Sequence, residues 1–151
     1  MIWSYSAEKR LVIWRNFRKT LEWKDLPEAA RDLAIWWKDI PSIEGFSTPW
    51  ATDSWPDPWN LIVHGPLTHT LTSVAMAYTL WMTALQEDKD RIELAVINDR
   101  AKRTVSLVVL IDTNLLINYN IGEVTDMSQI TDDVEILSTY GYSTFKSRIK
   151  A

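Results

Sequence analysis

The hydrophobic pattern predicts helices in the first half of the chain. Ser4 or Ser6 is placed to cap a helix over residues 7–23. Apolar side chains recur there every three to four positions, as they do on one face of a helix: Leu11, Trp14, Phe17 and Leu21. The other faces of this helix are mostly basic.

A second helix is predicted to begin after Asp25. The Asp25-Leu-Pro-Glu28 segment combines a capping side chain, a proline in the first turn and an acidic residue at the positive end of the helix dipole. The helix is expected to reach about Asp39, and Pro41 ends it. Its apolar residues share one inward face: Ala30, Leu33, Ala34 and Trp37.

A long uncharged helix is predicted to be the element around which the chain packs. Asp57-Pro58 opens a short helix through Ile62, and Gly65-Pro66 then breaks the chain direction. Residues 67–86 carry no charged side chain, and apolar or small residues occur on every face of the predicted helix. A helix with this composition is normally covered on more than one side.

The second half of the chain changes to a strand-like pattern. Residues 92–97, 104–111 and 115–119 predict three strands, with a polar hairpin connection between the first two. The pattern is weak from residue 126 onward, and residues 134–140 are ambiguous. Helices followed by strands indicate an α+β fold. We expect N-terminal helices and a central buried helix packed on a C-terminal antiparallel meander of three or more strands.

Length and composition favour one domain over residues 1–151, with an aromatic-rich helical and loop segment (1–60) before the central helix and sheet (61–151). Cysteine is absent, which excludes disulfides and thiolate chemistry. The net charge of −4 makes nucleic acid an unexpected partner. No signal peptide or membrane-spanning stretch is recognised. We therefore expect a soluble protein that is not secreted.

No catalytic set is recognisable in the sequence. The four glycines are not clustered, so phosphate-cradling loops are excluded, and neither a cofactor nor a metal site is predicted. Thr70 and Ser73 lie near the start of the central helix, where the dipole assists a nucleophile. The simpler interpretation is that the threonines and Ser73 cap or solvate the first turn.

The nine tryptophans are unusual, and eight of them precede the central helix. Several lie in or near residues 40–59, an irregular segment punctuated by four prolines. The rings either pin this segment onto the body of the protein or form a contact surface. The residues predicted for a protein–protein interface are Trp36, Trp50, Trp55 and Trp59, with Arg15 and Arg18 on the basic helix.

The order of the predicted elements resembles the core of transglutaminase-like and papain-like folds. A loop leads into a helix, and an antiparallel meander follows, with Asp112 just after a strand. In that family a Cys opens the helix, a His sits on the next strand and an Asp follows the one after. Here the helix opens with Leu67-Thr68-His69-Thr70 and the first strand has no His. The resemblance implies a shared fold whose usual catalytic residues are missing.

The segments RNFRKTLEW, WPDPWNLI and LINYNIGEV are similar to those of small proteins of T4-like tailed phages, including cyanophages. Together with the aromatic loop, the basic first helix and the absence of a catalytic set, this resemblance favours a non-enzymatic structural or assembly protein, located in the virion or the host cytoplasm. Its expected partners are other phage proteins or further copies of the chain. The alternative is a transglutaminase-like enzyme or small-ligand binding module. It would use His69, Thr70 or Asp112 at the N-terminus of the central helix, and those side chains would converge in a cleft.

Overall fold

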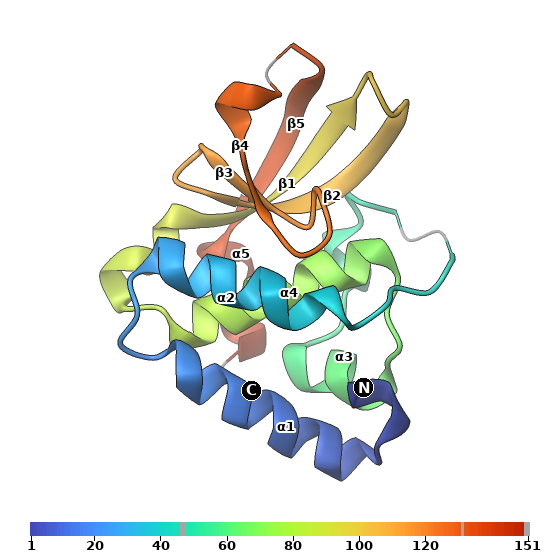
Figure 1. Ribbon diagram of the computed structural model, residues 1–151, viewed down its shortest axis with the longest axis vertical. Coiled ribbons are helices and arrows are strands. Elements are labelled where there is room, and N and C mark those ends of the chain that lie inside the picture. Colours follow the sequence, from blue (N-terminus) through green and yellow to red (C-terminus); the bar gives the residue numbers. More distant parts are fainter. Residues whose placement is uncertain (46–47, 131, 150–151) are drawn as a thin grey trace.

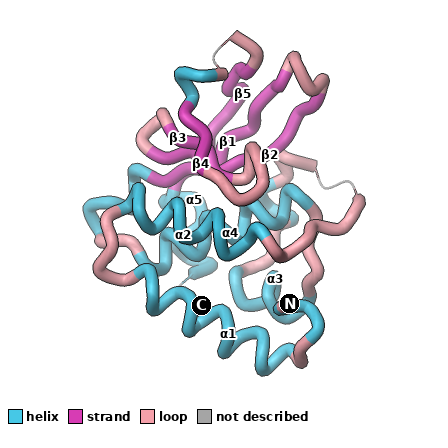
Figure 2. The backbone as a smooth tube through the Cα atoms, in the orientation of Figure 1, coloured by secondary structure: helices cyan, strands magenta, loops and turns pink. Residues whose placement is uncertain are grey.

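The computed structural model describes residues 1–45, 48–130 and 132–149 and has an α+β architecture. Five helices are packed below a twisted antiparallel sheet (Figure 1; Figure 2). The helices are α1 (Ala7–Leu21), α2 (Leu26–Lys38), α3 (Pro58–His64), α4 (His69–Thr83) and α5 (Tyr142–Ile149). The strands are β1 (Ile92–Asp99), β2 (Thr104–Ile111), β3 (Leu115–Ile117), β4 (Val124–Asp126) and β5 (Val134–Gly141). The predicted fold class is confirmed.

Helix α4 is the centre of the packing, as its uncharged sequence predicts. It lies between the sheet and the outer layer of α1 and α3 (Figure 1). Residues Thr72 to Trp81 are all buried. Its polar side chains are bonded to other elements: Thr79 Oγ1 accepts a hydrogen bond from Trp14 Nε1 at 3.0 Å, and Trp81 Nε1 donates to the Ile92 carbonyl at 3.1 Å.

Side-chain caps fix the starts of four helices. Ser6, Asp25, Asp57 and Thr68 each accept a hydrogen bond from a backbone N–H in the first turn of α1, α2, α3 and α4. A cap satisfies one of the amide groups that a helix start leaves without an intrahelical partner. The caps at Asp25 and Asp57 are those expected from the Asp-Leu-Pro and Asp-Pro sequences.

The strand order in the sheet is β4-β3-β2-β1-β5. The first four strands form the expected antiparallel meander, but β5 returns to pair with β1 at the opposite edge. Both faces of the sheet are apolar, because a second small core of Ala95, Ile97, Val108, Leu110 and others covers the face away from α4. The ambiguous residues 134–140 are therefore a strand that is specified by pairing with a distant segment.

Helix α5 follows β5 and closes the aromatic core. Phe145 is fully buried, and its ring centroid lies 5.3 Å from that of Trp81 and 5.9 Å from that of Trp55. Arg148 donates hydrogen bonds to the carbonyls of Thr52 and Trp55. The sequence pattern was too weak to predict this helix. None of the described helices is long and apolar enough to cross a membrane.

Candidate functional site

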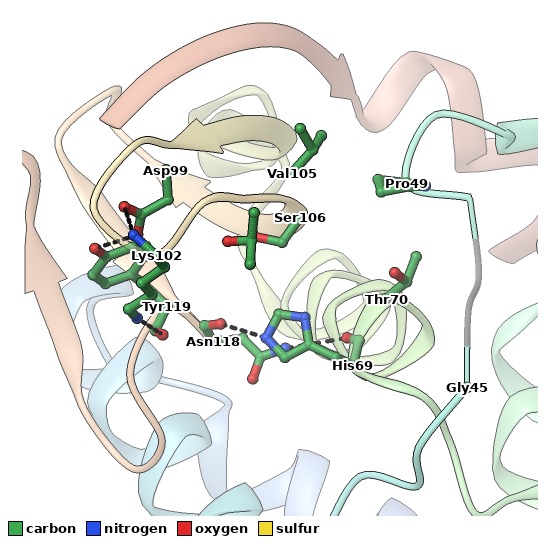
Figure 3. Close-up of a pocket in the computed structure, with 11 residues that line it drawn as sticks. Gly45, Pro49, His69, Thr70, Asp99, Lys102, Val105, Ser106, Asn118 and Tyr119 are labelled. Carbon is green, nitrogen blue, oxygen red and sulfur yellow. Dashed lines mark hydrogen bonds between the residues drawn. The ribbon is translucent and has the colours of Figure 1, made fainter. Parts of the chain in front are cut away.

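A cavity of about 320 Å³ opens where the N-terminus of α4 meets the β1–β2 hairpin and the end of β3 (Figure 3). Its polar lining comes from three separate parts of the chain: His69, Thr70, Asp99, Lys102, Thr104, Ser106, Asn118 and Tyr119. Cavities of this size are at the lower end of those that bind small ligands. The fold thus gathers titratable and amide groups that are up to fifty residues apart.

His69 is held in one orientation at the floor of the cavity. Its Nε2 lies 2.9 Å from the main-chain carbonyl oxygen of Asn118. A carbonyl oxygen only accepts, so Nε2 carries the proton. Burial, with a smaller contribution from the charge of Lys102, lowers the pKa of His69 below its usual 6.5, although the bond to Asn118 opposes this. At neutral pH the ring is therefore mostly neutral. Nδ1 makes no hydrogen bond to the residues that the structure describes, and Figure 3 shows this side of the ring turned toward Ser106 and Thr70.

Asn118 joins the helix start to the sheet. Its backbone is in the left-handed region, with φ of +69°. Its Nδ2 donates to Ser73 Oγ at 2.8 Å and to the His69 carbonyl at 3.3 Å. Ser73 Oγ in turn donates to the Leu107 carbonyl at 2.7 Å. This chain of bonds is buried and fixes where the imidazole of His69 lies. Ser73 has this structural role, rather than only solvating the first turn.

Asp99, Lys102 and Tyr119 form the opposite wall. Asp99 Oδ2 accepts from the Tyr119 hydroxyl at 2.7 Å, and Oδ1 accepts from the Lys102 backbone N–H at 3.1 Å. Burial alone would raise the pKa of Asp99, but these hydrogen bonds and the charge of Lys102 outweigh it and lower the pKa. Burial and the bond to Asp99 raise the pKa of Tyr119 to about 12. The Lys102 ammonium lies 4.0 Å from the centroid of the Tyr119 ring.

The pH titration of His69 gives a direct check of this geometry. We expect an NMR-detected pKa below 6.5, and the Nε2–H tautomer at pH 8. The pKa of His69 is lower in the folded than in the unfolded chain. The free energy of unfolding therefore has its full value above pH 6.5 and decreases as the pH falls through the folded pKa. The chain has two histidines, so a His64→Gln variant assigns the signals. A pKa above 6.5 for His69 would contradict the burial.

The three residues predicted at the N-terminus of the central helix, His69, Thr70 and Asp112, do not lie together. His69 and Thr70 line the cavity, but Asp112 lies beyond the end of β2, near the opposite end of α4. Arg91 binds Asp112 through Nε and Nη2 at 2.7 Å each, and this bidentate pair lowers the pKa of Asp112. The expectation that Asp112 belongs to the site is wrong, because the hairpin reverses the chain and carries the end of β2 away from the helix start.

The predicted interface tryptophans are dispersed. Trp55 is in the core against Phe145, and Trp36 is half-buried with its ring stacked on Phe17 at 4.3 Å. Trp59 is half-buried beside α1, while Trp50 is 57% exposed. Pinning of the loop therefore accounts for Trp55. The interface itself stays a prediction.

The two predicted interface arginines lie on α1. Arg15 is exposed. Arg18 is half-buried, with its guanidinium carbon 4.2 Å from the ring centroid of Trp14. Burial and the neighbouring charge of Arg15 lower the pKa of Arg18, against an opposing effect of Glu22. Arg18 thus serves packing in part, and Arg15 is the freer of the two for contact with a partner.

No protein-family model matches the sequence, and no curated protein sequence does. Solved structures of LapG from Legionella pneumophila superpose on nearly the whole chain. One covers 99% of this chain and 90% of its own, with a TM-score of 0.75 at 13% identity. The chain shares the fold of LapG. The calcium-bound structure covers 93% and 80% with a TM-score of 0.72 at 16% identity, and the EGTA-treated structure covers 93% and 78% with 0.73 at 15%.

The likeness to LapG confirms the transglutaminase-like resemblance at the level of fold. The likeness to LapG contradicts the prediction that the chain is not an enzyme. That prediction relied on the absence of cysteine and of a recognisable catalytic set. The first ground excludes only one nucleophile, and the second fails to find residues that the fold gathers from distant parts of the chain. The comparison adds nothing to the resemblance to phage proteins, which stays a prediction.

One of these LapG structures is calcium-bound. Across residues 1–45, 48–130 and 132–149, no group of three or more His, Cys, Asp or Glu side chains is arranged to hold a metal. In the cavity, both oxygens of Asp99 already accept hydrogen bonds. The residues described do not fit a calcium site, and no reaction step is assigned to a metal.

Sequence reasoning missed most of the cavity. The sequence predicts only a polar hairpin connection at Asp99 and Lys102, and only the end of a strand at Asn118 and Tyr119. A buried Asp at the last position of a strand and an Asn in a tight turn are weak signals by themselves. Only the pairing of β1, β2 and β3 brings these residues to the start of α4.

Proposed function

We propose that this chain is an enzyme with a transglutaminase-like fold and that it cleaves an amide or ester bond in the cavity at the start of α4. One observation carries the proposal: neutral His69 has its proton fixed on Nε2 and its Nδ1 lone pair in the cavity. A base needs this combination of protonation state and orientation. The likeness to LapG supports the proposal at the level of fold.

The reaction has to run without a thiol. Nδ1 of His69 takes a proton from a water molecule while the water oxygen attacks the acyl carbon. Collapse of the tetrahedral intermediate breaks the bond to the leaving group, and the imidazolium returns the proton to the leaving nitrogen or oxygen. The carbonyl of Asn118 holds the ring through both steps, in the manner of the orienting group of other histidine-based sites.

A cleavage assay on mixed peptides and acyl esters, read by mass spectrometry, tests the proposal. We expect His69→Gln to lower kcat/KM by about 100-fold or more, since general-base catalysis contributes about 10²–10⁴-fold. His64→Gln is the matched control, because His64 is exposed at the end of α3 and outside the cavity lining.

The pH profile separates a catalytic role from a structural one. The rate should fall as the pH drops through the pKa of His69, measured by NMR on the same protein. Peptide binding in the cavity without any cleavage would contradict the proposed enzymatic activity and would favour a ligand-binding module. Equal activity of the His69→Gln variant and the parent would remove His69 from the mechanism.

The resemblance to phage proteins supports a second candidate role, contact with other proteins of a tailed phage. The observation that favours it is the exposure of Trp50, at 57%, in a segment whose Trp55 ring is buried in the core. Exposed aromatic anchors are frequent at interfaces. A pull-down of phage proteins that is lost with Trp50→Ala, but kept with His69→Gln, would support this role independently of catalysis.

A further inference from the structure

A second cavity shares His69 with the cavity of the proposed active site. Its volume is again about 320 Å³, and it lies where the end of α2 and the start of α4 meet the loop after β3. His69 and Asn118 line both cavities. The hydrogen bond from His69 Nε2 to the Asn118 carbonyl therefore lies at the boundary between the two spaces.

The two cavities differ in chemistry. The lining of the first is mainly polar, whereas buried apolar side chains line the second: Ala34, Trp37, Met76 and Ile117. Ile121, which is 79% exposed, stands at its edge. Of the described residues in this lining, Lys38 alone carries a charge at neutral pH. This apolar cavity therefore favours an uncharged hydrocarbon group over a cation, which Lys38 repels.

The segment before α3 borders both cavities. Ser42 lines the apolar cavity and Gly45 lines the polar one. The segment is attached to the start of α4, because the backbone N–H of Ile43 donates to the Leu67 carbonyl at 2.9 Å. His69 is only partly buried, so a ligand can reach it from outside. A ligand long enough to occupy both cavities thus has to cross His69.

We propose that the substrate is a peptide that crosses His69 in an extended conformation and places an apolar side chain in the apolar cavity. This inference rests on the proposed function, because His69 makes the crossing point the place of cleavage only if it is the base. The bond to be cleaved lies in the polar cavity, toward which Nδ1 is turned (Figure 3). A small amide or ester without the apolar side chain fills one cavity only and reacts slowly.

Peptides that differ at one position near the cleaved bond test the specificity. One methylene group in a hydrophobic pocket changes kcat/KM by about 10–200-fold. We expect kcat/KM to be at least about tenfold higher with norleucine than with glycine at the selected position. Lysine has the same aliphatic chain as norleucine but ends in an ammonium group, so its value should fall toward that of glycine. Cleavage with no apolar preference at any position near the bond would overturn the inference.

An Ile121→Asp variant tests whether the apolar cavity is the source of this preference. It adds a carboxylate at the edge of the cavity, and the exposure of Ile121 makes a folding defect unexpected. The preference for norleucine over lysine should fall by about tenfold. Ile35→Asp is the matched control, because Ile35 is 60% exposed on α2 and lines neither cavity. An unchanged preference in Ile121→Asp, or an equal loss in Ile35→Asp, would contradict the assignment.

The methyl group of Met76 reports binding in the apolar cavity without any need for cleavage. N-acetyl-norleucine N-methylamide should shift its NMR signal in ¹³C-methyl-methionine protein, and the glycine analogue should not. A Met76→Leu variant assigns the signal, and Met82 and Met127, which line neither cavity, are internal controls.

The two measurements together separate this inference from the proposed function. A Met76 shift without cleavage of any peptide would keep the apolar cavity as a binding site and contradict the proposed function alone. Peptide cleavage combined with an unshifted Met76 signal would overturn the inference and leave the proposed function intact.

Discussion

Replacement of Phe145 by alanine is expected to lower the free energy of unfolding by about 3–5 kcal/mol. Phe145 is fully buried and lies within 6.1 Å, centroid to centroid, of the rings of Trp55, Tyr78 and Trp81. Its removal deletes apolar area and leaves a cavity beside these three rings. Urea unfolding followed by circular dichroism measures the loss.

Thr144→Ala is the control for this experiment, because Thr144 is exposed on the neighbouring position of α5. It should change the unfolding free energy by less than about 0.5 kcal/mol. For a chain of this size, the Phe145→Ala loss corresponds to a fall in Tm of roughly 10 °C. A loss below about 1 kcal/mol would show that α5 does not close the core.

Replacement of Asn118 by valine is expected to cost about 3 kcal/mol and to release His69. A β-branched residue is strongly disfavoured at φ of +69°, and valine also removes the hydrogen bonds that Nδ2 donates to Ser73 and the His69 carbonyl. Thermal unfolding measures the stability. The NMR titration of His69 measures the second effect, a rise of its pKa toward 6.5 as the site opens to water.

The Asn118→Gly variant separates the backbone strain of valine from the loss of the Nδ2 hydrogen bonds. Glycine accepts the left-handed backbone without strain but lacks the amide. We expect it to lose about half as much stability as Asn118→Val. Equal losses for the two variants would assign the whole cost to the hydrogen bonds, and no loss for either would mean that the network around Ser73 does not hold the site together.

The local parts of the fold follow from local chemistry. Asp25 and Asp57 cap their helices as predicted, because the signal for a helix start lies within four residues of the cap. The strand over Thr104–Ile111 is also found with its predicted bounds. The uncharged composition of the central helix correctly indicates burial on several sides, since no face of it can be left in water.

The parts of the fold that depend on contacts between distant segments cannot be predicted from local sequence. β5 is specified by pairing with β1, some forty residues earlier in the chain, and no local pattern carries that partner. Helix α5 is short and mostly polar, and it is stabilised by contacts with distant segments, through Phe145 in the core and Arg148 on the carbonyls of Thr52 and Trp55. The cavity likewise depends on the pairing of segments that are distant in the sequence. His69 and Thr70 were recognisable at a helix start, but Asp99, Asn118 and Tyr119 reach it only through the register of three strands.

The position of Phe145 also has a consequence during synthesis on the ribosome. Tyr78 and Trp81 are covered by a ring that is translated about sixty residues later, which takes several seconds at about 5–20 residues per second. Throughout that interval the nascent α4 has no complete cover for its aromatic face. We expect the unfinished chain to be prone to aggregation, so that the yield of folded protein depends on holding chaperones more than the stability of the finished molecule suggests.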